Sequence, residues 1–385
     1  MDIADLRVAL FSGNYNYVRD GANQALNRLV GYLLRQGAAV RTYAPVVEPA
    51  AFPPTGDLVG TPAVPIPFRR EYRFPLGLSR ANLEDLARFA PDVLHVSSPD
   101  VTGHAALRWA EERNLPVLAS VHTRFDTYLR YYGLAMAEPW FRRIMRRFYN
   151  RCDAIAAPSD SMVEWLRAQG MSKNIGIWSR GVDRTIFDPD RRDLAWRRAL
   201  GIADDEVAVG FLGRLVMEKG LDVFADTVAA LQARGVPHKV LVVGEGPAHD
   251  WFAERVPDAR FTGILTGAEL GRALASMDLL LNPSVTETFG NVTLEAMASG
   301  VPVIAARATG STSLVVDGGT GRLVEPGQIA GFADAVAGYV ADPALRILHG
   351  VAGEVRSRAY SWDAINRTVA DTYLRLVEAR RSRSA

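Results

Sequence analysis

The sequence predicts an α/β fold made of two doubly wound parallel-sheet domains. Short apolar segments at 7–12, 93–96 and 115–122 alternate with amphipathic segments of helical periodicity. The same alternation starts again at 207–215 and continues to 301–305. Strands that alternate with helices are typical of parallel sheets covered on both faces. A chain of 385 residues is long enough for two such domains.

Composition describes an ordinary globular protein, with 48% hydrophobic and 23% charged residues. Lys and Arg (44) balance Asp and Glu (43), so net charge predicts no nucleic-acid partner. Cys152 is the only cysteine, which excludes an intrachain disulfide and favours a cytoplasmic location. We expect no signal peptide, because the first apolar run (8–11) is short and follows acidic residues. No apolar run is long enough to cross a bilayer, so any membrane contact is expected to be peripheral.

The first half contains further expected elements. A helix is predicted over 22–37, a strand over 40–44 and a second helix over 103–113. Residues 45–78 are proline-rich and lack periodicity, so they are expected to form loops with one short strand. The apolar segment CDAIAAPS predicts another strand, with Ser159 as the N-cap of the next helix.

The second half repeats the pattern. Strands are predicted at 207–215 and 277–281, and a helix at 221–235. KVLVVGEGP predicts a further strand that ends in a glycine turn. Asn291 begins a helix-forming segment that Gly300 ends, and helices are expected after Gly321.

The segment 282–302, NPSVTETFGNVTLEAMASGVP, holds the strongest candidate site. It lies between two predicted strands, at the carboxyl edge of a parallel sheet, where open α/β folds bind ligands. Glu287 could accept hydrogen bonds from sugar hydroxyls, and Glu295 from both hydroxyls of a ribose. The alternative is one exposed loop glutamate and one helix-surface glutamate. The backbone N–H groups expected to favour an anion are those of Phe289, Gly290 and Asn291.

A second candidate lies in GRLVMEKG, which follows the strand at 207–215. Arg214 and Lys219 flank this turn at the carboxyl end of a buried strand. An arginine fork and a lysine point charge both suit a diphosphate. The alternative is two cations that are solvated at the surface.

Together, ETFGNVTLEAMASGVPVIA and GRLVMEKG resemble the motifs of retaining GT-B glycosyltransferases of glycosyltransferase family 4, also called group 1. The resemblance covers nearly the whole chain. It implies a GT-B fold, in which two Rossmann-like domains face a cleft. It also implies retention of anomeric configuration, no metal and no cofactor, because the nucleotide-sugar is a co-substrate.

The resemblance assigns the donor-binding residues by position. They are Gly213, Arg214, Lys219, Gly244, Gly263, Ile264, Glu287, Thr288, Phe289, Gly290, Asn291 and Glu295. Arg214, Lys219 and Glu287 are expected to act in catalysis as well. His122 ends a buried strand, and the matching histidine of the family faces the donor sugar, so His122 joins the predicted catalytic residues.

The acceptor is expected to bind the N-terminal domain through Gly21, Asn23, Arg130 and Tyr131. The loop GNYNYVRDGAN lacks a G-x-G-x-x-G fingerprint and departs from the paired-glycine form of the family. A plain strand-to-helix turn is therefore the alternative for Gly21. A surface loop that packs its tyrosines is the alternative for the segment 128–132.

Basic and aromatic residues mix between Trp140 and Arg151. This composition suits an interfacial helix on an anionic membrane, and the alternative is a domain helix with a solvated arginine face. Asp188 and Asp190 form a D-x-D pair that elsewhere would suggest a metal; beside a proline we interpret it as a turn or N-cap.

The segment WSRGVD resembles the crossing between domains in lipid-directed mannosyltransferases and sulfoquinovosyl-type transferases. We therefore expect domains at 1–180 and 193–358, a linker at 181–192, and a C-terminal helix within 359–385 that packs on the first domain. The predicted reaction moves a hexose from GDP-mannose to a lipid-linked or glycan acceptor. UDP-glucose, UDP-glucuronate or UDP-sulfoquinovose is the alternative donor. A GT-B phosphorylase and a non-catalytic nucleotide-binding module are the other classes.

Overall fold

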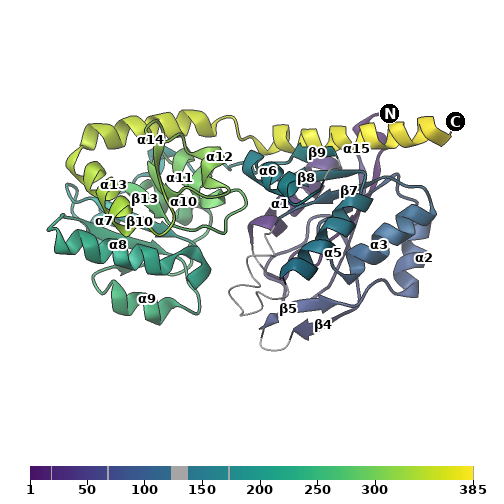
Figure 1. The fold of residues 1–385 in the computed structure, drawn as a ribbon, viewed down its shortest axis with the longest axis horizontal. Helices are drawn as coiled ribbons and strands as arrows, with labels where there is room; N and C mark the ends of the chain where they lie inside the picture. Colours follow the sequence, from purple (N-terminus) through teal and green to yellow (C-terminus); the bar gives the residue numbers. More distant parts are fainter. Residues whose placement is uncertain (19, 67–68, 123–137, 172–173, 385) are drawn as a thin grey trace. The chain divides into compact units, whose positions relative to one another are not determined.

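The computed structural model describes residues 1–18, 20–66, 69–122, 138–171 and 174–384 (Figure 1). The chain divides into two compact units. The first contains residues 1–180 together with 362–385, and the second contains 181–361. Each unit is built around its own parallel sheet, which confirms the predicted α/β class.

The sheet of the first unit has seven strands in the order β3-β2-β1-β6-β7-β8-β9, and all its pairings are parallel. The strands are β1 (Arg7–Phe11), β2 (Ala39–Ala44), β3 (Asp57–Gly60), β6 (Val93–Val96), β7 (Val117–Ser120), β8 (Ala154–Ala157) and β9 (Asn174–Ile177). The helices are α1 (Gly21–Arg35), α2 (Arg80–Phe89), α3 (Val101–Glu112), α5 (Glu138–Arg151), α6 (Asp160–Ala168) and α15 (Trp362–Ser384), with a short 3-10 turn η1 (Ile3–Asp5).

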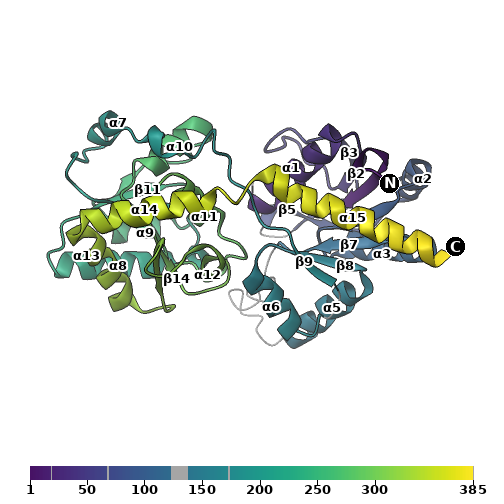
Figure 2. The same cartoon turned by 90° about the horizontal axis from the view of Figure 1, so that it is seen from above.

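Helices cover both faces of this sheet. Leu94 and Val96 of β6 belong to the core that α2, α3, α5 and α6 also line. His95 points to the other face, because side chains alternate along a strand. There its ring contacts Tyr373 of α15. The long C-terminal helix packs against α1 (Figure 2). It also contacts β6, so the last residues of the chain complete the first unit.

The segment 45–78 holds more structure than predicted. Besides β3, it forms an antiparallel pair of β4 (Ala63–Ile66) with β5 (Arg69–Pro75). The expectation of one short strand was therefore wrong. Proline interrupts the alternation, yet Pro65 lies in a two-stranded ribbon with a register shift beside it, where a missing N–H is tolerated.

The sheet of the second unit has six parallel strands in the order β12-β11-β10-β13-β14-β15. The strands are β10 (Ala208–Leu212), β11 (Lys239–Val243), β12 (Arg260–Phe261), β13 (Leu279–Asn282), β14 (Val303–Ala306) and β15 (Gly321–Val324). The expectation that only helices follow Gly321 missed β15. Four residues at a sheet edge, only half of them buried, give too short an apolar pattern to detect.

Two apolar cores lie on the two faces of this sheet. Val209 and Phe211 pack with α8 and α13, whereas Ala208 packs with α10 and α11. The helices are α7 (Leu194–Ala199), α8 (Leu221–Ala233), α9 (His249–Arg255), α10 (Gly267–Ala275), α11 (Asn291–Ala298), α12 (Ser311–Leu314), α13 (Ile329–Ala341) and α14 (Pro343–Ser357), with 3-10 turns η3 (Pro189–Arg191) and η4 (Met217–Lys219).

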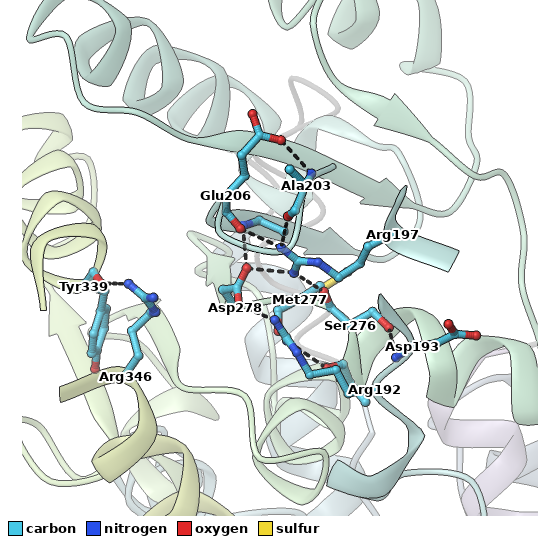
Figure 3. Close-up of polar contacts among 12 residues, drawn as sticks. Arg192, Asp193, Arg197, Ala203, Glu206, Ser276, Met277, Asp278, Tyr339 and Arg346 are labelled. Atoms are coloured by element: carbon cyan, nitrogen blue, oxygen red, sulfur yellow. Dashed lines mark hydrogen bonds and ion pairs between the residues drawn. The ribbon is translucent and has the colours of Figure 1, made fainter. Parts of the chain in front are cut away.

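A buried ion pair ties α7 to the amino end of this sheet (Figure 3). The Arg197 side chain is fully buried, and its Nη1 donates to Asp278 Oδ2 at 2.8 Å. The same guanidinium donates to the carbonyl oxygens of Ser276 (2.8 Å) and Glu206 (2.6 Å). Asp278 also accepts from the Ala208 N–H at 2.7 Å, so one carboxylate connects α7, β10 and the residue before β13.

Candidate functional site

Three glycines hold the loops together at the carboxyl edge of the second sheet. Gly213 follows β10, Gly244 follows β11, and Gly263 lies just beyond β12. The Gly244 N–H donates to the Gly263 carbonyl oxygen at 2.9 Å. A Cβ on Gly244 would lie 2.0 Å from the Gly213 carbonyl oxygen, and its φ of 135° also requires glycine. The loops after β10 and β11 therefore pack backbone against backbone at Gly244, where only glycine fits.

Lys219 and Glu287 meet at this edge. Lys219 ends η4, and Glu287 lies in the loop between β13 and α11. The Lys219 Nζ donates to Glu287 Oε1 at 2.6 Å. The lysine side chain is 32% exposed and the glutamate 10%. A ligand oxygen that binds beside Glu287 is therefore within reach of the Lys219 charge.

The loop that carries Glu287 is anchored on the turn that carries Lys219. Thr286 Oγ1 donates to the Glu218 carbonyl oxygen at 3.1 Å, and Ser284 Oγ donates to the same oxygen at 3.4 Å. Gly220 packs against Pro283, and its φ of 74° lies in the left-handed region. These contacts fix both loops in a common position before any ligand binds.

The N-terminus of α11 lies next to this pair. Gly290 is the N-cap residue with a φ of 99°, and it makes no side-chain cap hydrogen bond to the first turn. The loop at Gly310 packs directly on the same backbone, because a Cβ there would lie 2.9 Å from the Phe289 carbonyl oxygen. Uncapped amides at a helix N-terminus favour an anion.

Three polar side-chain atoms beside this helix lack a hydrogen-bond partner among the described residues. They are Asn291 Oδ1, Thr309 Oγ1 and Ser311 Oγ, all buried. Buried polar atoms of native proteins are nearly always paired, so these atoms fit a polar ligand. Asn291 was predicted from the sequence as a donor-binding residue, whereas Thr309 and Ser311 were not. Their position just after the strand that ends at Ala306 was the one feature of the sequence that could have indicated a functional role.

The remaining predicted donor residues of this unit lie along the same edge. Arg214 is exposed beside Gly213, and Ile264 is 72% exposed beside Gly263. Glu295 is half-buried in the second turn of α11, and Thr288 is half-buried in the loop before it. The structure therefore brings the predicted donor residues to one edge of one sheet, from the loops after β10, β11, β12 and β13.

In the first unit His122 follows β7, as predicted. Its Nε2 contacts Ser120 Oγ at 2.7 Å, and its Nδ1 contacts Arg180 Nη2 at 2.8 Å. Burial and then the Arg180 charge lower the pKa of His122 well below its ordinary value. The ring is therefore held neutral at physiological pH. Arg180, which was interpreted from the sequence only as part of the domain crossing WSRGVD, is its direct neighbour.

Gly21 and Asn23 open α1. Asp20 is the N-cap and accepts from the Asn23 N–H at 2.8 Å, while the Asn23 side chain donates to the Val18 carbonyl oxygen. Asn23 is 3% exposed, so its side chain shapes the loop. Its predicted contact with an acceptor, and that of Gly21, stay predictions. Arg130 and Tyr131 lie outside the described residues.

No cluster of metal-ligating side chains occurs within the ranges that the structure describes. The D-x-D pair has the predicted structural role, since the Asp188 side chain accepts from the Asp190 N–H and caps η3. Among the helices described, none is both long and apolar enough to cross a membrane.

Comparison with known families supports the resemblance of the motifs. Residues 19–185 match Glycosyltransferase Family 4, and residues 206–342 match Glycosyl transferases group 1. A GDP-mannose-dependent alpha-mannosyltransferase of Mycolicibacterium smegmatis is 34% identical over 366 residues, which cover 94% of this chain and 95% of that protein. The chain belongs to the family 4 glycosyltransferases.

Two further proteins resemble this glycosyltransferase. Sulfoquinovosyl transferase SQD2 of Arabidopsis thaliana is 30% identical over 93% of this chain and 71% of its own length. The solved structure of sucrose-phosphate synthase from Thermosynechococcus elongatus superposes with a TM-score of 0.80 at 20% identity, over 97% of this chain and 99% of that one. The structural likeness confirms the GT-B fold. The chain is thus a nucleotide-sugar-dependent enzyme built on two parallel-sheet domains.

Proposed function

We propose that this glycosyltransferase moves mannose from GDP-mannose to a lipid-linked or glycan acceptor, with retention of anomeric configuration and without a metal or cofactor. The observation that carries the proposal is the Lys219–Glu287 pair beside the uncapped N-terminus of α11. A cation for phosphate and a carboxylate for sugar hydroxyls lie one hydrogen bond apart. The mannosyltransferase relative supports the choice of GDP-mannose.

The residues of the second unit stabilise the leaving group in this proposal. Negative charge grows on the diphosphate as the bond to the sugar carbon breaks. Lys219, Arg214 and the amide groups at Gly290 stabilise that charge from positions fixed in advance. Glu287 orients the sugar through its hydroxyls, and Glu295 accepts from the ribose.

The anomeric configuration is retained if the acceptor attacks the sugar carbon from the same face that the diphosphate leaves. The new bond joins the acceptor oxygen to the sugar carbon, and the carbon–phosphate oxygen bond breaks. The acceptor's proton passes to the departing phosphate oxygen, so the step needs no protein carboxylate as nucleophile. The lowered pKa of His122 makes its ring a weak proton acceptor, which agrees with a route in which the phosphate oxygen takes the proton.

Only part of α5 is available for the membrane contact that was predicted from the sequence. Met145, Phe148 and Tyr149 are buried in the core of the first unit, so most of the apolar face of α5 is internal. Trp140 is 68% exposed. The polar side opens into a groove of about 550 Å³ lined by His104, Ile144, Arg146, Arg147, Asn150 and Arg151. We propose that contact with an anionic membrane runs through these arginines and Trp140.

A thermal-shift panel tests the donor. GDP, UDP, GDP-mannose and UDP-sugars are each added to the full chain, with and without magnesium. A ligand at a hundred times its dissociation constant stabilises the folded state by about 2.7 kcal/mol. We expect GDP and GDP-mannose to raise the unfolding temperature, equally with and without magnesium.

Stabilisation by UDP compounds alone would overturn the donor and favour UDP-glucose, UDP-glucuronate or UDP-sulfoquinovose. Stabilisation by a nucleotide-sugar without release of nucleoside diphosphate would favour a non-catalytic binding module. Turnover that requires inorganic phosphate would favour a phosphorylase.

A further inference from the structure

A row of hydrogen-bonded side chains that includes His122 runs through the first unit. It begins at Arg180, passes through His122 and Ser120, and continues to His95 on β6. Ser120 Oγ lies 2.7 Å from His95 Nε2, and His95 Nδ1 contacts the Tyr373 hydroxyl. The row thus connects the end of β7 to the C-terminal helix α15. His95, Ser120 and Tyr373 are fully buried.

Arg180 is held firmly at the head of this row. It is 4% exposed, and its Nη1 donates to the Trp178 carbonyl oxygen at 2.9 Å and to that of Ser179 at 3.1 Å. Its guanidinium lies over the Trp178 ring, 5.0 Å from the centroid. The His122 ring meets the same indole edge-on at 5.4 Å. The nearby Asp20 carboxylate supplies opposite charge. Arg180 therefore has little freedom to turn away from His122.

The chemistry of arginine sets the direction of every hydrogen bond in the row. A guanidinium only donates, so His122 Nδ1 must accept and the ring proton must lie on Nε2. His122 Nε2–H then donates to Ser120 Oγ, and the Ser120 hydroxyl donates to His95 Nε2. His95 Nδ1–H donates in turn to the Tyr373 hydroxyl oxygen.

We infer that Arg180 is a positioning residue that holds His122 as the neutral Nε2–H tautomer and fixes its ring against Trp178. His122 then presents a fixed, uncharged edge to the reacting sugar and does not act as a proton acceptor. The role in transfer rests on the proposed function of His122. The tautomer rests on the contact between Arg180 and His122 within the first unit.

Nuclear magnetic resonance of the full chain with ¹⁵N-labelled histidine tests the tautomer. The His122→Gln variant lacks this imidazole ring, so the ¹⁵N signals that disappear from its spectrum are those of His122. In the wild type we expect His122 to show a protonated Nε2 and an unprotonated Nδ1. In Arg180→Met both nitrogens should move toward averaged values, because the donor that makes Nδ1 the acceptor is gone. Arg180→Lys keeps a positive donor and should restore part of the wild-type pattern.

Arg113→Met is the matched control. Arg113 also lies over a tryptophan of the first unit, 4.3 Å from the Trp109 centroid, and donates to its carbonyl oxygen. It should leave the His122 signals unchanged. A wild-type His122 protonated on Nδ1, or identical signals in wild type and Arg180→Met, would overturn the inference.

A double-mutant cycle tests the role in transfer. Arg180→Met should lower kcat for donor consumption by about 10- to 100-fold with little change in KM, as expected for a misplaced catalytic group. In a His122→Ala background the same change should have no further effect. If the two substitutions instead lower kcat independently, so that their effects multiply in the double variant, Arg180 acts only through the stability of the fold. That result would overturn its positioning role. If the wild type consumes no nucleotide-sugar, both the proposed function and the role of Arg180 in transfer are wrong. The nuclear magnetic resonance experiment would still decide which tautomer His122 adopts.

Discussion

Replacing Lys219 with alanine should lower turnover of the nucleotide-sugar by about 10²- to 10³-fold. The substitution removes a preorganised donor from the charge that grows on the leaving diphosphate, and such donors contribute about that much. It also releases Glu287, whose carboxylate is held by Lys219 at 2.6 Å. Steady-state release of nucleoside diphosphate measures the loss. Glu287→Ala combined with Lys219→Ala should cost less than the product of the two single effects, because the residues act as a unit.

Lys239→Ala is the matched control for this experiment. Lys239 also pairs with a glutamate, Glu206, at 3.3 Å, and its side chain is 34% exposed, close to the 32% of Lys219. It begins β11 at the opposite, amino end of the same sheet. Turnover of Lys239→Ala should stay near that of the wild type. Near-normal turnover in Lys219→Ala would refute the leaving-group role of this lysine.

Replacing Asp278 with alanine should destabilise the second unit by about 3–5 kcal/mol. The substitution leaves the Arg197 guanidinium buried without its carboxylate, and a broken buried ion pair costs about that amount. The Ala208 N–H loses its acceptor as well. Amide hydrogen exchange, read on peptides that cover β10 and β13, reports the free energy of opening of this unit separately from the first.

Asp204→Ala supplies the comparison for this stability measurement. Asp204 pairs with Arg198 at 3.6 Å, and both side chains are half exposed or more, at 50% and 61%. Exposed pairs of this kind contribute about 0–1 kcal/mol. A loss for Asp278→Ala no larger than that of Asp204→Ala would contradict the structural role of the buried pair.

The fold class, most strands and the gathering of the candidate donor residues at one sheet edge could be predicted from the sequence, because parallel strands place their following loops at one edge. The Lys219–Glu287 contact could not. It requires β10 and β13 to be neighbours, as they are in the observed strand order, and the sequence gives no strand order. Lys219 and Glu287 were therefore predicted as separate ligands for phosphate and sugar.

Other residues could not be predicted because their roles depend on contacts in the folded structure. Thr309 and Ser311 carry common hydroxyl groups. What distinguishes these hydroxyl groups is burial without a hydrogen-bond partner in the part of the chain that the structure describes. Arg180 lies in WSRGVD, which was interpreted as a domain crossing, and its contact with His122 joins residues 58 positions apart. The aromatic residues Phe148 and Tyr149 were predicted to suit a membrane interface, whereas the structure buries them in the core.

We propose that the carboxyl edge of the second sheet binds a nucleotide-sugar and activates its diphosphate as a leaving group. Release of nucleoside diphosphate, measured with GDP-mannose and with UDP-sugars on the wild type and Lys219→Ala, tests this claim most directly. We expect the wild type to release GDP from GDP-mannose, slowly without an acceptor, and Lys219→Ala to release it about 10²-fold more slowly. No release from any nucleotide-sugar, or equal release by both proteins, would contradict it.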